Sequence, residues 1–264
     1  MMQVTMRGTL LPCKLLQYSP HVLQSSLQKQ IIPSFDFFVS LFQSEDKFIK
    51  ALKRFSSIFV LNTDAVPNIK VLIEVGVPEW NIVKLLQRHP RALTKKRDLF
   101  KKIVAEVKVM RFNALTGQFL LAVATLTRIR KSTWERKADL YKRWGWSDDD
   151  ILAAFGRFPH CMAVSEDKIE MIMDFFVNQM GCESSTVAIY PQLLGLSLKK
   201  RIVPRASVIQ VLLSKGFVKQ LVFPRMFYAS EKVFLDKFIA CQGKEADQLL
   251  KLYQAIMEVE QKIL

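Results

Sequence analysis

Three arginines occupy equivalent places in a repeating pattern of this sequence. Arg54, Arg88 and Arg157 each lie 12 residues after a recurring position of the chain (42, 76 and 145, derived below). A guanidinium is permanently charged, and its forked donors match phosphate oxygens. A regular array would therefore align these side chains as a cationic ladder for a polyanion. A cation at the end of a helix also stabilises that helix by about 0.3–1 kcal/mol, so both interpretations stay open.

A second group of cations lies near the C-terminal third of the chain. With no acidic residue between them, its members are Lys199, Lys200, Arg201 and Arg205. Ser197 is a typical helix N-cap, and Pro204 suits a first helical turn, so part of this segment is predicted to be a structural corner. We expect at least two of the four cations to contact nucleic acid.

The whole chain carries a large basic surplus. Its 264 residues include 39 Lys and Arg against 24 Asp and Glu, a formal net charge of +15. The densest runs are residues 84–102, with eight cations and one acid, and residues 128–143, with seven cations and two acids. Such a surplus repels itself in a compact fold unless a polyanion offsets it. Nucleic acid is the leading candidate and an anionic membrane surface the second. A charge that only keeps the protein in solution is the third interpretation.

Residues that could support catalysis are few and scattered. The histidines, His21, His89 and His160, have no nucleophilic Ser or Cys at motif spacing, and glycine-rich phosphate loops are absent. The cysteines are far apart in the sequence, which predicts neither a disulfide framework nor a zinc site. We therefore expect no enzymatic activity, no cofactor and no metal. Trp80 and Trp144 are predicted to pack in the core, although exposed indoles can stack on bases.

The ends of the chain and its apolar runs bear on location. The longest apolar run, residues 119–126, is far shorter than the roughly 20 residues of a membrane-spanning helix, so we expect no membrane partner. Residues 1–35 contain no acidic residue. That composition is compatible with an organelle presequence, and also with an ordinary frayed terminus.

A repeat of about 35 residues organises the chain. Each of four glycines ends an amphipathic stretch: Gly76, Gly145, Gly181 and Gly216, at intervals of 69, 36 and 35 residues. The first interval equals two periods, with Arg111 at its middle. Counting back by 34 from Gly76 reaches Phe42. Six repeats are therefore predicted, with phases at 42, 76, 111, 145, 181 and 216.

Each repeat is predicted to contain a pair of helices. The first helix ends at the glycine, which readily adopts the left-handed conformation of a helix C-cap. A helix-start signal follows, for example Ser147 with three Asp residues after it. The second helix carries one apolar face, as at Ile151, Leu152, Phe155 and Phe158. It ends at a proline, Pro90 or Pro159, 14 residues after the glycine. Such pairs bury their apolar faces by stacking on their neighbours, which predicts an all-α solenoid.

Several segments at the ends of these repeats resemble the mTERF (mitochondrial transcription termination factor) family, especially its plant-type members. They are Leu85–Pro90 with Leu93 after it, Phe155–Pro159, Tyr190–Leu194 and, most specifically, Ser197–Arg205. The resemblance covers roughly residues 31–225. It implies a superhelical solenoid whose repeats combine two antiparallel helices with a short third helix. It also implies a basic concave face, an organelle location, a role in transcription termination or transcript maturation, and no catalysis.

These observations lead to a domain division and three function hypotheses. Residues 1–30 are predicted to form an N-terminal tail, residues 31–225 the repeat array and residues 226–264 C-terminal capping helices. The leading hypothesis is a monomer that binds double-stranded DNA and regulates transcription in the mitochondrion, with the chloroplast as the alternative. RNA binding for splicing or transcript stability is the second hypothesis, and a protein-interaction scaffold is the third.

Overall fold

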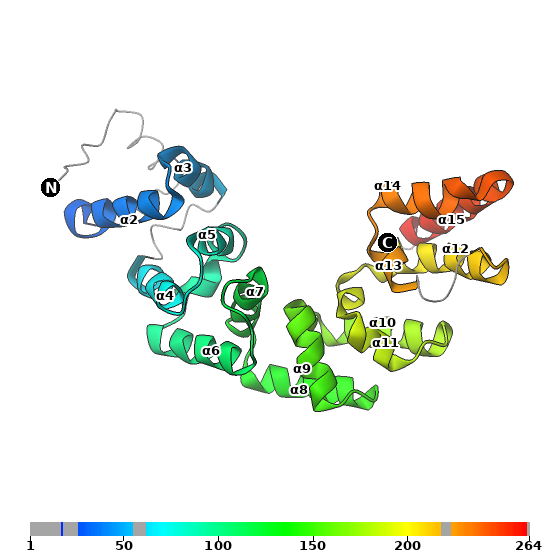
Figure 1. Ribbon diagram of the computed structural model, residues 1–264, viewed down its shortest axis with the longest axis horizontal. Coiled ribbons are helices and arrows are strands. Elements are labelled where there is room, and N and C mark those ends of the chain that lie inside the picture. Colours follow the sequence, from blue (N-terminus) through cyan, green and yellow to red (C-terminus); the bar gives the residue numbers. More distant parts are fainter. Residues whose placement is uncertain (1–16, 18–25, 55–61, 218–222, 263–264) are drawn as a thin grey trace. The chain divides into compact units, whose positions relative to one another are not determined.

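Every structural element described for this protein is helical (Figure 1). The computed structural model describes residues 17, 26–54, 62–217 and 223–262, and none of these residues lies in a β-strand. The chain divides into two compact units, unit 1 (residues 1–131) and unit 2 (residues 132–264). Each unit consists of consecutive helical repeats. The predicted all-α repeat fold is therefore confirmed.

Left-handed residues mark the end of the first helix in six successive repeats. Positive φ angles occur at Gly76 (87°), Gly145 (86°), Gly181 (65°) and Gly216 (73°), as the repeat predicts. The two repeats without a glycine use Gln43 (φ 53°) and Arg111 (φ 62°) instead. Position 111 thus matches the predicted phase, and the first repeat is displaced by one residue from the predicted position 42.

A backbone hydrogen bond closes the helix at these caps. In unit 1, the N–H of Val77 donates to the carbonyl of Leu72 at 3.0 Å, and Phe112 donates to Val107 at 3.4 Å. The same six-residue closure recurs in unit 2, for example from Phe217 to Leu212 at 2.9 Å. This is the pattern of a Schellman C-cap. It explains how Arg111 occupies a conformation that usually favours glycine.

The described part of unit 1 contains three helix pairs and one short 3-10 helix. In chain order, after a π-helical turn at Leu27–Ile31 (η2), they are α2 (Ile32–Phe42), α3 (Glu45–Arg54), α4 (Asn62–Glu74), α5 (Glu79–Arg88), the 3-10 helix η4 (Pro90–Thr94), α6 (Arg97–Val109) and α7 (Gly117–Leu126). Pro90 ends α5 as predicted, because proline disfavours helix in the residue before it. The chain then turns into η4, which packs against α4, α5 and α7.

Unit 2 continues the pattern from α8, which begins at the unit boundary. Its first two repeats are α8 (Lys131–Arg143), α9 (Asp148–Arg157), η5 (Pro159–Ala163), α10 (Glu166–Asp174), η6 (Phe175–Gln179), α11 (Ser184–Ile189) and η7 (Pro191–Gly195). The remainder is η8 (Leu198–Ile202), α12 (Val203–Ser214), α13 (Phe223–Tyr228), α14 (Glu231–Phe234), η10 (Leu235–Ile239), η11 (Ala240–Glu245) and α15 (Ala246–Lys262). The short helices η5 and η7 begin at Pro159 and Pro191, so each proline again ends a second helix.

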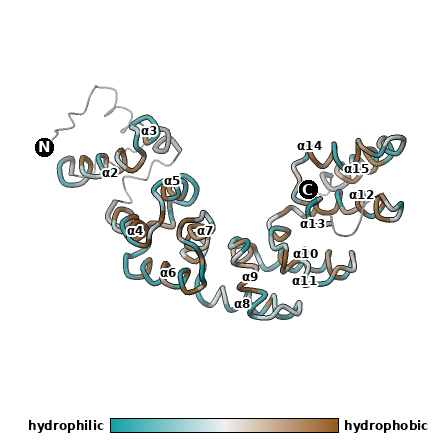
Figure 2. Tube along the Cα trace, in the orientation of Figure 1, coloured by the Kyte–Doolittle hydropathy of each residue, from teal (hydrophilic) through white to brown (hydrophobic). Residues whose placement is uncertain are grey.

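The cores of both units form from helices that bury one face. Figure 2 shows hydrophobic and hydrophilic residues side by side along the helices. In α5 the buried residues Ile82, Leu85 and Leu86 repeat at helical spacing, so the intervening positions of α5 face solvent. Among the described residues, no helix is both long and apolar enough to cross a membrane.

Three local predictions can be compared directly with the structure. Ser147 begins α9 with a capping box, accepting from the N–H of Asp150 at 3.1 Å while the Asp150 carboxylate accepts from the N–H of Ser147 at 2.9 Å. That prediction is confirmed. Leu152, expected on the apolar face of α9, is exposed. The prediction that Trp80 packs in the core is wrong, because 56% of it is exposed on α5.

Candidate nucleic-acid interface

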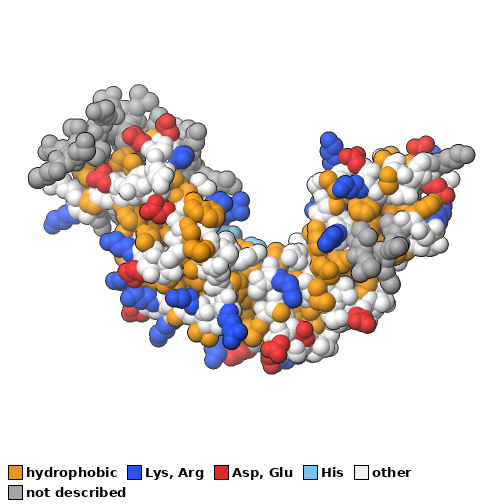
Figure 3. All heavy atoms as spheres, viewed as in Figure 1, with side chains coloured by type: hydrophobic (Ala, Val, Ile, Leu, Met, Phe, Trp, Pro, Cys, Tyr) orange, Lys and Arg blue, Asp and Glu red, His pale blue; other side chains and the backbone are white. Residues whose placement is uncertain are grey.

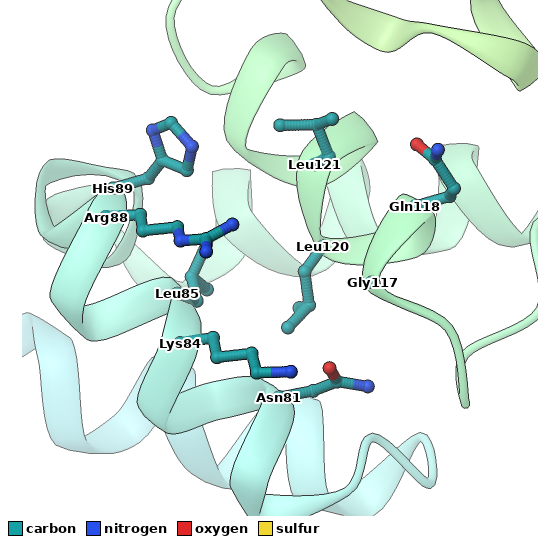
Figure 4. A pocket seen from close by; sticks show the side chains of 9 residues that line it. All are labelled: Asn81, Lys84, Leu85, Arg88, His89, Gly117, Gln118, Leu120 and Leu121. Carbon is teal, nitrogen blue, oxygen red and sulfur yellow. The ribbon is translucent and has the colours of Figure 1, made fainter. Parts of the chain in front are cut away.

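A basic groove runs along the C-terminal half of α5 and η4 in unit 1. It consists of two adjoining cavities that share Arg88 and His89. The first has a volume of about 370 Å³ and lies between α5 and the start of α7 (Figure 4). The second, of about 650 Å³, lies between η4 and the end of α7. We refer to the two cavities together as the unit 1 groove.

Cations dominate the polar lining of the unit 1 groove. It is lined by Lys84, Arg88, Arg91, Lys95 and Arg128, and by no carboxylate among the described residues. In the described part of the chain, none of these five side chains pairs with a carboxylate. Uncompensated cations in a concave surface concentrate a positive potential there. The groove is therefore suited to a polyanion.

The positions of these cations follow from the local fold. Lys84 and Arg88 are exposed and flank Leu85 on the face of α5 that lines the groove (Figure 4), since residues three and four apart share one side of a helix. Arg88 is the last residue of α5, where a cation also interacts favourably with the helix dipole. The two interpretations given to this arginine are thus compatible.

Polar but uncharged side chains complete the first cavity. The amides of Asn81 and Gln118 line it together with leucines from α5 and α7 (Figure 4). Asn81 is buried, and its Nδ2 donates to the carbonyl of Leu115 at 3.0 Å. Beside this cavity, the Lys84 ammonium lies 4.4 Å from the centre of the exposed Trp80 ring. The i, i+4 spacing of Trp80, Lys84 and Arg88 is a sequence signal for this surface that the predicted arginine ladder does not include.

The predicted arginine ladder has different outcomes at its three positions. Arg88 lies in the unit 1 groove. Arg157 ends α9 in unit 2, where it is exposed. Hydrogen bonds from Ser147, and to a lesser extent the charge of Arg157, lower the pKa of the Asp150 carboxyl. Arg54 is the last residue of α3, and its side chain lies outside the described residues.

The structure contradicts the prediction that Arg205 contacts nucleic acid. It is fully buried, and its guanidinium donates to the carbonyls of Met226 (3.0 Å) and Phe227 (3.1 Å) and to the Glu231 carboxylate (2.8 Å). Its charge also lies 4.5 Å from the centre of the Phe234 ring. Arg205 therefore ties α12 to the chain around α13 and α14 and is not available to a phosphate.

Arg201 has a similar internal role, whereas the lysines before it do not. Its Nε donates to the carbonyl of Phe227 at 3.0 Å, and its terminal nitrogen donates to that of Tyr228 at 3.1 Å. Burial lowers the pKa of its guanidinium. Lys199 and Lys200 are exposed on η8, whereas Arg201 is half-buried and Arg205 is buried.

Other cations of unit 2 are neutralised within the fold. Arg136 pairs with Glu166 at 2.6 Å and Arg143 with Glu170 at 2.9 Å, both across neighbouring repeats, and the pair Lys142–Asp148 forms at 2.8 Å. On the face shown in Figure 3, Lys and Arg side chains are numerous over α4 and α6 of unit 1. Three of the seven cations in the second dense basic run, residues 128–143, thus pair with acids of unit 2.

Comparison with known proteins agrees with the repeat architecture. The mTERF family profile matches residues 10–129 and 116–235, which together span most of the chain. This protein belongs to the mTERF family. The two matched ranges cover all the helix pairs whose caps were predicted from the glycine spacing, so the resemblance of the repeat-end segments is confirmed.

Two relatives of the family come from Arabidopsis thaliana. The chain is 27% identical over 137 residues to the chloroplastic transcription termination factor MTERF8, covering 52% of this chain and 27% of the relative. It is 23% identical over 173 residues to the mitochondrial transcription termination factor MTERF15, covering 62% of this chain and 38% of the relative. The aligned region thus spans well under half the length of these relatives.

Proposed function

We propose that this mTERF protein binds nucleic acid through the unit 1 groove and acts in organelle gene expression. Its proposed ligand is double-stranded DNA, and the proposed outcome is regulation of transcription or of its termination. The observation that carries the proposal is the convergence of five cations without an acidic neighbour in the described groove lining. Phosphate groups are the natural partners of such a surface.

The spacing of the cations suits a sugar–phosphate backbone. Lys84 and Arg88 are one helical turn apart on α5, which separates them by about 6 Å along the helix axis. Arg91 and Lys95 extend the row through η4, and Arg128 lies across the second cavity. Contacts of this kind fix position and orientation on nucleic acid without reading its sequence. The groove is therefore proposed as a phosphate-tracking surface.

The family and its relatives support the proposed biological role. The two plant relatives are named as transcription termination factors of the chloroplast and the mitochondrion. We propose an organelle location for this chain, with the mitochondrion first and the chloroplast as the alternative. Arg54, Arg157, Lys199 and Lys200 stay candidate contacts, and the protein is proposed to act as a monomer without catalysis.

The test is a titration of the full chain against labelled duplex DNA, duplex RNA and single strands at several salt concentrations. If five phosphates are neutralised on duplex DNA, the log–log slope of affinity against salt should be about −4 to −5. Stronger binding to RNA or to single strands would show that this nucleic acid, and not duplex DNA, is the ligand. A slope near zero on all of them would overturn the proposal.

A further inference from the structure

A buried asparagine holds the end of the short helix that forms one side of the unit 1 groove. Asn68 lies in α4 and is fully buried. Its Nδ2 donates to the backbone carbonyl of Leu93 at 2.9 Å and to that of Lys95 at 2.7 Å. These carbonyls lie at the C-terminal end of η4, where helical carbonyls otherwise lack partners. One side chain therefore fixes the backbone that carries Lys95.

The equivalent position in unit 2 is a lysine. Lys137 in α8 is buried, and its Nζ donates to the carbonyls of Met162 at 2.8 Å and Val164 at 2.5 Å. The two acceptors lie 25 and 27 residues after the donor in both repeats. Burial lowers the pKa of Lys137, opposed by the charge of Glu166. The same tether thus holds η5 to α8 and η4 to α4.

The next two repeats also use cations for this contact. Lys168 of α10 donates to the carbonyl of Gly195 at 3.2 Å, at the end of η7. Arg201 of η8 donates to the carbonyls of Phe227 and Tyr228 near the end of α13, as described above. Every one of these side chains acts only as a hydrogen-bond donor. The position requires donors and offers no partner for an acceptor.

At this position, asparagine leaves one of its own polar atoms without a partner in the described part of the chain. Its Oδ1 atom is buried and has no hydrogen-bond partner among the described residues. An unsatisfied buried acceptor is unfavourable, and a lysine would avoid it. What asparagine provides instead is a short, uncharged side chain with few torsions, directly behind the backbone of a groove cation.

We propose that Asn68 is a positioning residue of the unit 1 groove, which holds η4 so that Arg91 and Lys95 face the nucleic acid. The inference rests on the proposed function of the groove. Packing of η4 against α4, α5 and α7 holds its start, so loss of the tether should loosen mainly its C-terminal end, which bears Lys95. A neutral tether also adds no repulsion beside Lys95. Asn68 itself touches no ligand and acts through these two residues.

The direct experiment replaces Asn68 with the nearly isosteric leucine in the full chain. Affinity for labelled duplex DNA is measured by fluorescence anisotropy at several salt concentrations. Loss of one well-placed phosphate contact should weaken binding about tenfold at 0.1 M salt and reduce the magnitude of the log–log slope by about 1. A helical circular-dichroism signal equal to that of the parent shows that the variant is folded.

Lys137→Leu is the matched control, since it cuts the same tether in unit 2. It should lower the melting temperature while leaving the affinity of the folded protein and the salt slope unchanged. If Asn68→Leu does no more to affinity and slope than Lys137→Leu does, Asn68 has only a structural role and the inference is overturned. Should Asn68→Leu not fold, Asn68→Gln keeps the amide donor at a longer reach, and we expect a smaller loss of affinity.

A double-mutant cycle tests the route of the effect. In an Arg91→Ala/Lys95→Ala background, Asn68→Leu should cause no further loss of DNA affinity. An undiminished loss in that background would contradict action through these cations.

Hydrogen exchange of residues 90–95 gives a readout without DNA: exchange should be faster in Asn68→Leu and unchanged in Lys137→Leu. If the parent protein shows no salt-dependent DNA binding, the proposed function is wrong. If hydrogen exchange is unchanged in Asn68→Leu, the inference about Asn68 is wrong, and the proposed function of the groove is unaffected.

Discussion

The two units of this protein use similar numbers of cations in different ways. In unit 1, Lys84, Arg88 and Arg91 line a groove without a carboxylate among its described lining residues. In unit 2, Arg136 and Arg143 pair with acids that lie about one repeat further along the chain. Positive residues that look equivalent in the sequence are therefore proposed to bind a ligand in unit 1, whereas they join neighbouring repeats in unit 2. The deciding feature is where the compensating acid lies.

The cavities of the two units also differ in the number of cations that line them. A cavity of about 590 Å³ in unit 2 is lined by the aromatic rings of Phe158, Tyr190 and Tyr228 and by a single cation, Arg225. The unit 1 groove contains five cations and no aromatic ring besides the imidazole of His89. Since phosphate contacts supply most of the salt-dependent affinity for nucleic acid, we expect that affinity to depend mainly on unit 1.

The largest effect should come from removing groove cations. We expect Arg88→Ala/Arg91→Ala/Lys95→Ala to weaken duplex DNA binding by about 500-fold at 0.1 M salt, the effect of three lost phosphate contacts. Fluorescence anisotropy measures it. The matched control Arg136→Ala/Lys142→Ala/Arg143→Ala removes the same charge from ion pairs of unit 2. Equal losses from both triple variants would mean that net charge, and not the groove, controls binding.

The second effect concerns the buried corner of unit 2. Arg205→Ala should lower the free energy of unfolding by about 3 kcal/mol, because it leaves buried carbonyls without a donor. Lys199→Ala, six residues earlier and exposed, should change it by less than about 0.5 kcal/mol. Chemical denaturation followed by circular dichroism measures both. A stable Arg205→Ala protein with weakened DNA binding would return this residue to the binding surface.

The helix caps provide a smaller contrast between the units. Arg111 in unit 1 and Gly145 in unit 2 occupy equivalent left-handed caps with φ of 62° and 86°. Arg111→Gly should stabilise the protein by about 1 kcal/mol, and Gly145→Ala should destabilise it by about the same amount. No atom lies within 4 Å of a Cβ added at Gly145, so the backbone conformation alone is tested. Thermal denaturation of both variants is the measurement, and a neutral Gly145→Ala would refute the strain argument.

The smallest effect is a pH dependence in unit 2. Desolvation raises the pKa of the Glu231 carboxyl, but hydrogen bonds from Tyr253 and Arg205 outweigh it and leave the pKa below the ordinary value of 4.5. A lowered folded-state pKa contributes stability above about pH 4.5, which is lost as pH falls through the folded value. Glu231→Gln should therefore cost less than about 1 kcal/mol at neutral pH. That difference should shrink below pH 4.5, whereas a pH-independent difference would contradict the assignment.

Much of the fold could be predicted from the sequence because its markers are local. Gly76, Gly145, Gly181 and Gly216 end helices through their own backbone freedom, and Pro90 and Pro159 end helices through their own ring. The capping box of Ser147 is equally local. Even the slot at 111, where no glycine occurs, was placed correctly by the period. Only the first repeat, where Gln43 takes the cap, was displaced by one residue.

The candidate site could be predicted only in part, because it depends on contacts between distant residues. Arg88 was identified by its place in the repeat. The burial of Arg205 depends on carbonyls 21 to 24 residues away, and no spacing within the Ser197–Arg205 segment reveals them. Likewise, the ion pair of Arg136 depends on an acid 30 residues away. The exposure of Trp80 was also missed, because α5 turns that position away from the buried face.

Chemical footprinting of lysines is the most direct test of the central claim. The full chain is acetylated briefly with and without saturating duplex DNA, and the modification of each lysine is measured by mass spectrometry. Lys84 and Lys95 of the unit 1 groove should become protected on DNA binding, while Lys142 of unit 2, paired with Asp148, should react equally in both samples. Unchanged reactivity of Lys84 and Lys95, with protection confined to the lysines of unit 2, would contradict the assignment of the nucleic-acid surface to unit 1.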